Sequence, residues 1–203
     1  MGAGNTPLAW AAGSGHEEVV EMLLGRDDIN PDKLNGNGQT PLCCAARKGH
    51  EGVVKMLLRR DDVNPDVPNI HGRTPLWYAA LNGHVGVVKA LLGHVEVNPN
   101  KAGEYGLTPL GGAAKHGHEG VAKILLSRDD INPNEPGWFG QTPLCCAAEN
   151  GHEGVVKMLL GRDDVDPNKA AYGLRPLYYA TKCGHAGVIA LLQPLESTTL
   201  NTS

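Results

Sequence analysis

Long hydrophobic runs are missing from this chain of 203 residues. No apolar stretch approaches the ~18 residues that a membrane-spanning helix requires. No basic segment followed by an apolar segment opens the chain, as it does in a secretory signal. We therefore expect an intracellular, cytoplasmic protein with no membrane partner.

Concentrated positive charge is also missing. The formal net charge is −4, the isoelectric point is about 6.1, and no Lys/Arg-rich run occurs. Nucleic-acid-binding domains usually carry a basic patch or stripe. Nucleic acid is therefore not expected as a partner.

Cysteines are few and badly placed for disulfides. They form two adjacent pairs and a single residue: Cys43, Cys44, Cys145, Cys146 and Cys183. This pattern predicts reduced thiols in a reducing compartment. A zinc site needs about four converging ligands, whereas adjacent cysteines on one short helix point in different directions. We interpret the pairs as small buried side chains between helices, and we expect no metal and no cofactor.

Catalytic motifs are missing as well. The chain has no Walker loop and no nucleophile elbow, and the run that starts at His16-Glu17 lacks the second His of a zinc protease helix. We therefore expect no enzyme activity and no catalytic residues.

What the chain has in abundance is repetition. A Thr-Pro-Leu phrase recurs every 34 residues, and a sixth copy, Arg175-Pro176-Leu177, follows 33 residues after the fifth. The five phrases begin at Thr6, Thr40, Thr74, Thr108 and Thr142. Such a period indicates a stack of one supersecondary unit. The predicted copies are 1–34, 35–68, 69–102, 103–136, 137–169 and 170–193, followed by a polar tail, 194–203, with Pro194 expected to end the last helix.

One copy is enough to predict a pair of helices. In copy two, Thr40 suits a helix N-cap and Pro41 the first helical position. Gly49 suits the left-handed residue that ends this first helix. The segment 51–58 then carries apolar residues at helical spacing. The fold class is therefore predicted to be all-α.

The repeated pattern Thr-Pro-Leu-x-x-Ala-Ala-x-x-Gly-His-x-x-Val-Val-x-x-Leu-Leu resembles the ankyrin repeat over residues 4 to about 193. The resemblance implies a solenoid of paired helices with projecting β-turn fingers. It also implies that partners dock on the concave surface of fingers and first helices. The His that usually follows Thr-Pro-Leu is absent from every copy. The variant turn spelling, as in Asp27 to Pro31, is similar to fungal ankyrin arrays.

Two other repeated features are predicted to have structural roles. Six of the nine histidines belong to the repeated Gly-His that follows each first helix, and we expect them to form hydrogen bonds at the start of each second helix. The Arg-Asp-Asp steps at Arg26, Arg60, Arg128 and Arg162 could form an acidic ladder for a cation. Solvated turns with Arg–Asp pairs between copies are the preferred interpretation.

Aromatic residues are scarce, and all nine fall at four positions of the repeat. One group begins the first helices and is predicted to pack in the core or between copies: Trp10, Trp77, Tyr78, Tyr178 and Tyr179. The other group lies on the fingers, where core packing is harder to achieve. With the equivalent residues of copy three, it forms the predicted partner-binding strip: Ile70, His71, Tyr105, Trp138, Phe139 and Tyr172. Trp138 and Phe139 are expected to be the strongest anchors, and packing between neighbouring fingers is the alternative.

The sequence thus predicts a monomeric, non-catalytic module that binds a protein partner. Two alternatives stay open. The chain could be a regulatory segment of a larger multidomain enzyme, such as a fungal signal-transducing NTPase, since no polar capping helix precedes the first copy. It could also be an engineered scaffold, since copies two and five share Gln-Thr-Pro-Leu-Cys-Cys-Ala-Ala.

Overall fold

The computed structural model describes residues 4–199, apart from the side chains of Trp138 and of residues 196–199. It contains two compact units, which divide between Glu104 and Tyr105. Each unit is built from pairs of helices, as the repeat predicts. The prediction of an all-α fold is confirmed: residues 4–199 contain no strand, and a single β-bridge joins Ala171 and Leu174.

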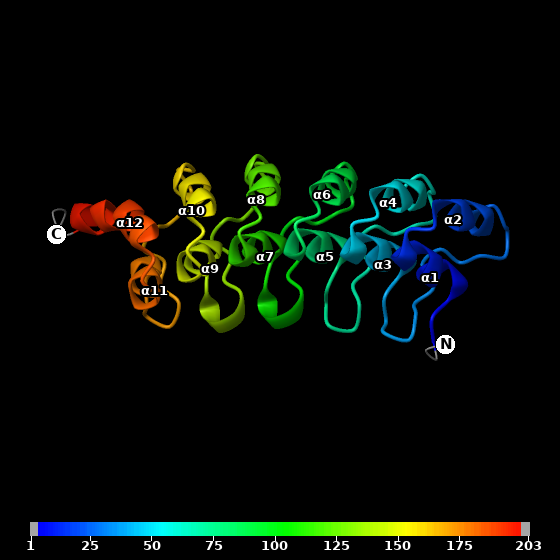
Figure 1. Ribbon diagram of the computed structural model, residues 1–203, viewed down its shortest axis with the longest axis horizontal. Coiled ribbons are helices and arrows are strands. Elements are labelled where there is room, and N and C mark those ends of the chain that lie inside the picture. The colour runs from blue at the N-terminus through cyan, green and yellow to red at the C-terminus, as the bar shows by residue number, and fades with distance from the viewer. Residues whose placement is uncertain (1–3, 200–203) are drawn as a thin grey trace. The chain divides into compact units, whose positions relative to one another are not determined.

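The first unit contains three helix pairs. They are α1 (Pro7–Ser14) with α2 (Glu17–Leu24), α3 (Pro41–Lys48) with α4 (Glu51–Leu57), and α5 (Pro75–Leu81) with α6 (Val85–Leu92). In Figure 1 the first helices of these pairs form one row and the second helices another. The loops before α3 and α5 project from the row of first helices, on the side away from the second helices.

The second unit contains the other three pairs. They are α7 (Pro109–His116) with α8 (Glu119–Leu126), α9 (Pro143–Glu149) with α10 (Glu153–Leu160), and α11 (Pro176–Cys183) with α12 (Ala186–Thr199). The expectation that Pro194 ends the last helix is wrong, because α12 continues through it to Thr199. Proline lacks the N–H for one helical bond and its ring crowds the carbonyl four residues earlier, which is why it usually ends or kinks a helix; here it lies inside α12 instead.

Threonine and glycine set the limits of the first helices. The hydroxyl of each repeated Thr accepts the backbone N–H three residues on; the Thr40 to Cys43 bond, for example, is 3.1 Å. This is the standard N-cap geometry. Arg175 replaces Thr in copy six, and α11 has no side-chain cap. Gly49 ends α3 in the left-handed conformation, with φ of 80°.

The core is a layer of leucine and valine between the two rows of helices in each unit. Leu42 and Leu57 are fully buried in the first unit, and Leu110 and Leu125 are fully buried in the second. Small alanines, such as Ala45 in α3, allow the first helices to pack closely.

The repeated Gly-His joins neighbouring copies. His50 donates through Nε2 to the carbonyl oxygen of Gly13 at 3.2 Å, and His152 donates likewise to Lys115 at 3.1 Å. The glycine lies against the histidine ring of the next copy: a Cβ on Gly49 would lie 2.7 Å from the ring of His84. The structural role predicted for the repeated histidines is confirmed at His50, His84, His152 and His185, whose acceptors are carbonyl oxygens of the preceding copy.

The repeated arginines correct one expectation. Arg60 pairs with Asp62 in its own turn, at 2.7 and 2.8 Å, rather than with an aspartate of another copy. Arg26, Arg128 and Arg162 pair in the same local way. The two-residue spacing brings the carboxylate within reach of the guanidinium fork, and this lowers the pKa of Asp62. The link between copies runs instead from Nη1 of Arg60 to the carbonyl oxygen of Leu24, at 2.6 Å.

Candidate partner-binding surface

The fingers of the first unit are short hairpins held by their own asparagines. Asn35 donates its backbone N–H to Gln39, and Gly38 donates back to Asn35, each at 2.9 Å. The buried side chain of Asn35 also accepts the backbone N–H groups of Asn37 and Gln39. Asn69 repeats this arrangement in the next finger. The finger backbone is therefore fixed before any ligand binds.

One phenol anchors both of these fingers to the helices. The hydroxyl of Tyr78, a buried residue of α5, accepts hydrogen bonds from Gln39 Nε2 and Asn69 Nδ2, each at 2.9 Å. Neither Gln39 nor Asn69 is exposed, so these contacts are shielded from water.

The predicted site residues of the first unit lie at the tip of its second finger. Ile70 is 76% exposed, and His71 beside it is also exposed. An isoleucine this exposed contributes little to the core, so its apolar side chain is accessible to a partner.

Three fingertip aromatics of the second unit have an unusual backbone. Tyr105, Phe139 and Tyr172 have φ of 57°, 55° and 50°, in the left-handed region. They are the only non-glycine residues within 4–199 with positive φ. Bulky side chains rarely adopt this conformation, and each instance costs about 1–3 kcal/mol.

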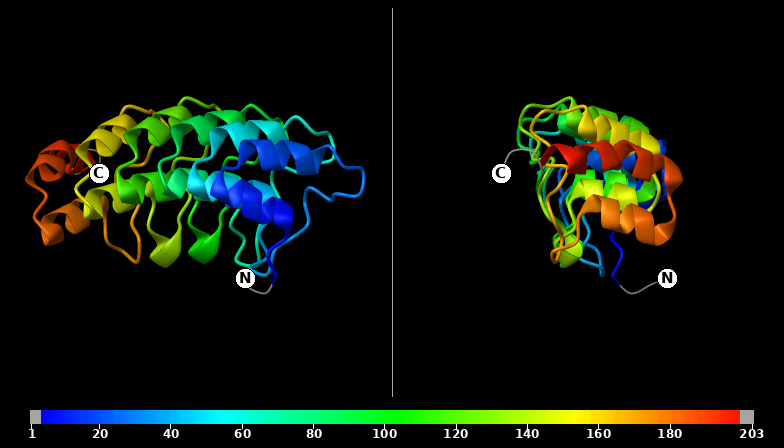
Figure 2. Two further views of the ribbon diagram at one scale, coloured as in Figure 1. Left: turned by 45° about the vertical axis from the view of Figure 1, so that its right-hand side comes forward. Right: turned by 90° about the vertical axis from the view of Figure 1, so that its left-hand side faces the viewer.

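The same three side chains are exposed. Tyr105 is 57% exposed, Phe139 55% and Tyr172 76%. The rings of Phe139 and Tyr172 lie 6.2 Å apart between centroids, so these two fingers form one small aromatic patch. Figure 2 shows the fingers before α9 and α11 projecting from the first helices. The side chain of Trp138 lies outside the described part of the structure.

Sequence reasoning found these positions but missed their backbone conformation. A signal was available: each aromatic directly precedes a glycine that also has positive φ, as in Tyr105-Gly106 and Tyr172-Gly173. That all six predicted residues form one continuous strip stays a prediction, since two belong to the first unit and four to the second.

The aromatics of the first helices only partly fulfil their prediction. Trp77, Tyr78 and Tyr179 are buried as expected, but Trp10 is 56% exposed and Tyr178 46% exposed. Trp77 is covered by the next turn, where a Cβ on Gly103 would lie 2.7 Å from the indole. Tyr178 occupies the same position in copy six, and none of the described residues forms a following copy that could cover it.

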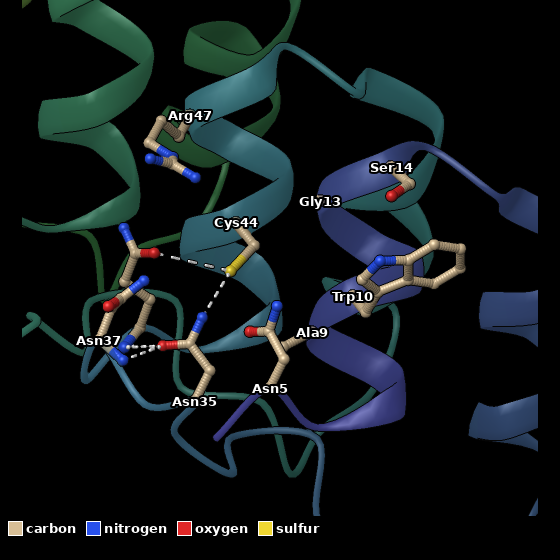
Figure 3. A pocket seen from close by; sticks show the side chains of 10 residues that line it. Asn5, Ala9, Trp10, Gly13, Ser14, Asn35, Asn37, Cys44 and Arg47 are labelled. Carbon is tan, nitrogen blue, oxygen red and sulfur yellow. Dashed lines mark hydrogen bonds between the residues drawn. The ribbon is translucent and has the colours of Figure 1, made fainter. Parts of the chain in front are cut away.

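Two hollows lie beside the first finger of the first unit. One, of about 160 Å³, separates it from α1 and is bordered by Asn5 and Trp10 (Figure 3). The other, of about 260 Å³, separates it from the next finger. Asn37, Gln39 and Arg47 line both hollows.

The two cysteine pairs have the buried positions expected of packing residues. Cys43, Cys44, Cys145 and Cys146 are buried, and Cys183 is exposed. Burial raises the pKa of Cys43 and Cys146 to about 12, so these thiols stay protonated. Within the described residues, no three His, Cys, Asp or Glu side chains are arranged to hold a metal ion.

No described helix is long and apolar enough to cross a membrane.

Comparisons with known proteins agree with this architecture. The family model for ankyrin repeats (3 copies) matches residues 2–69, 60–136 and 127–201. The crystal structure of the human ASB11 ankyrin repeat domain superposes with a TM-score of 0.81 at 26% sequence identity, covering 94% of this chain and 83% of that one. No curated protein matches the sequence. Repeated helix pairs, capped by Thr and joined through Gly-His, together with a family match over nearly the whole length, show that the chain belongs to the ankyrin repeat family.

Proposed function

We propose that the chain is a non-catalytic module that binds a protein partner through its fingers. Ankyrin repeat domains typically mediate protein–protein interactions. In this chain the aromatic fingertips of the second unit act as the main anchors. Ile70 and His71 form a second contact group in the first unit.

The observation that carries the proposal is the combination of exposure and unfavourable backbone at Tyr105, Phe139 and Tyr172. Asparagine or glycine would adopt the same conformation at lower cost. Rings that are half exposed or more return little burial energy to the fold. Their cost is understandable if the rings are held for a partner, because aromatic side chains are enriched among the residues that dominate binding energy.

A partner that covers these rings would gain buried apolar area without first ordering the loop. The finger hairpin before α9 is closed by the bond from Gly137 N–H to Gln141, at 2.8 Å. Preformed binding surfaces lose less conformational entropy on association. Trp138 stays an anchor on the sequence argument alone.

The test compares capture by the wild-type chain and by the double variant Phe139→Asn/Tyr172→Asn. Asparagine tolerates positive φ, so the finger backbone is kept while both rings are removed. Proteins captured from a lysate by the wild type and lost by the double variant are the expected partners. Val95→Asn is the matched control, because Val95 is fully exposed and lies outside the fingers.

Val95→Asn should capture the same proteins as the wild type. If the double variant retains every protein that the wild type captures, the fingertip rings are not the anchors. Trp138→Gly, tested in parallel, decides whether that residue belongs with them.

A further inference from the structure

The first unit carries unpaired positive charge where its two hollows meet. Arg47 lines both hollows and is exposed, and its guanidinium forms no ion pair or hydrogen bond with the described residues. Arg73, which lines the larger hollow, differs because it pairs with Glu104 and lies 5.2 Å from the ring centre of Trp77. Neither hollow has an Asp or Glu in its lining. Their charge therefore complements an anionic ligand, and Arg47 is the arginine free to bind it.

Free amides surround this arginine. Asn5 and Asn37 are exposed, and their side-chain amides form no hydrogen bond within the described residues. Each amide offers both donors and an acceptor, so it can pair with a peptide backbone. Buried Gln39 separates the hollows and is held by Tyr78, which keeps the floor between them rigid.

Apolar side chains stand on the two outer borders. Trp10 borders the smaller hollow and is 56% exposed, and Ile70 borders the larger one. A chain that crosses both hollows would therefore meet an apolar side chain in each hollow, with Asn37 and Arg47 shared between the two. Two adjoining hollows with apolar side chains in each and charge and amides shared between them fit an extended peptide better than a small compact anion.

We propose that the two hollows bind an extended acidic peptide segment, with Arg47 pairing with an Asp or Glu carboxylate. Asn5 and Asn37 bond to the peptide backbone, and Trp10 and Ile70 contact apolar side chains on either side of the acid. The inference rests on the proposed function in taking the partner to be a protein, but it uses a different surface from the aromatic fingertips.

The test uses a random peptide display library as the probe and the whole chain as the target. Enriched peptides should share one Asp or Glu with apolar residues on both sides. Synthetic versions should bind Arg47→Glu at least ten-fold more weakly than the wild type, as expected for loss of a charge-assisted pair. Replacing the shared acid by Lys should restore binding to Arg47→Glu.

Lys48→Glu is the matched control. It makes the same change of net charge one residue along α3, at an exposed residue that lines neither hollow. It should weaken binding less than three-fold. Because Arg47 and Lys48 are both exposed, both variants should keep the wild-type circular dichroism spectrum and melting temperature.

Three results would overturn the inference. They are a selection without enrichment of acidic peptides, equal weakening by Arg47→Glu and Lys48→Glu, and displacement of the peptides by a ten-residue oligothymidylate, which would indicate a nucleic-acid site instead. Phe139→Asn/Tyr172→Asn should leave peptide affinity unchanged. The Arg47 variant therefore tests peptide binding at the two hollows, and the double variant separately tests binding by the fingertip rings.

Discussion

At the scale of single residues, backbone conformation and exposure distinguish the residues that pack within the fold from those that are exposed to a partner. Phe139 and Tyr172 have left-handed backbones and exposed rings. Gly49 has a left-handed backbone as the residue that ends α3, and a histidine ring fills the space that a Cβ would take there. Both kinds of position favour small residues. The fingertip positions nevertheless carry aromatic residues, whereas the position that ends α3 carries glycine.

The left-handed conformation of Phe139 can be tested by two substitutions that both remove the ring. Asparagine tolerates positive φ, whereas β-branched valine does not. We expect Phe139→Asn to be more stable than Phe139→Val by roughly 1 kcal/mol, the scale of the left-handed cost. Urea unfolding of both variants measures the difference, and equal stabilities would mean that Phe139 is not left-handed in solution.

The contact between glycine and histidine predicts a second difference. Gly49→Ala carries the left-handed cost of a side chain and also a clash with His84, at 2.7 Å from the added Cβ. Gly184→Ala carries only the first, because nothing lies within 4 Å of its Cβ position and φ is 76°. We expect Gly184→Ala to cost about 1 kcal/mol and Gly49→Ala clearly more. Thermal unfolding measures both, and similar losses would argue against the inter-repeat contact.

Thiol reactivity tests burial at the cysteines. The thiolate is the reactive form, and burial raises the pKa of Cys43 and Cys146 from 9.0 to about 12. At pH 8 we expect iodoacetamide to label only exposed Cys183 in the folded chain and all five cysteines after unfolding. Because folding raises these pKa values, the thiols stabilise the fold fully below pH 9. That stabilisation declines as the pH rises toward 12. Intact-mass measurement counts the labels, and rapid labelling of a second thiol would contradict the packing.

At the scale of helices, each second helix is held by an apolar stripe that only neighbouring copies can cover. Leu125 of α8 is fully buried, while Leu23, at the same position of copy one, is partly exposed. We expect Leu125→Ala to cost roughly 2–5 kcal/mol and Leu23→Ala considerably less. Chemical denaturation of the two variants compares the same Leu→Ala substitution at a buried and at a partly exposed position. A loss within about 0.5 kcal/mol at Leu125 would place it on the surface.

The helices were the most predictable part of the structure. Thr40, Pro41 and Gly49 encode the limits of α3 locally, so the sequence pattern alone predicts them. Trp10 and Tyr178 show where prediction from the repeat pattern fails. Their repeat positions predict burial, but burial depends on a neighbouring copy that the described residues do not supply.

Predictions also failed where a side chain could choose between partners. Arg60 bonds to Asp62 in its own turn and to the backbone of the preceding copy, and spacing alone did not distinguish these partners from an aspartate in another copy. The fingers were located correctly from their aromatics. Their left-handed conformation does not follow from the aromatics themselves, because only the glycine after each one, as in Tyr105-Gly106, indicates it.

At the scale of the whole molecule, the repeats supply two different surfaces. The first unit offers amides and an unpaired arginine around two hollows, and the second offers exposed aromatic fingertips. In a repeat array each copy is stabilised mainly by its neighbours. Surface residues can therefore differ between copies while the core stays the same, which explains how nearly identical helices carry such different fingers.

Hydrogen–deuterium exchange, with and without the partner captured by the wild-type chain, tests the central claim most directly. Exchange reports protection of backbone amides, so it locates the bound surface without any substitution. We expect the partner to slow exchange at residues 104–107, 137–141 and 171–174, and to leave α8, α10 and α12 unchanged. Protection confined to those second helices, with the fingers exchanging as in the free chain, would contradict binding through the fingers.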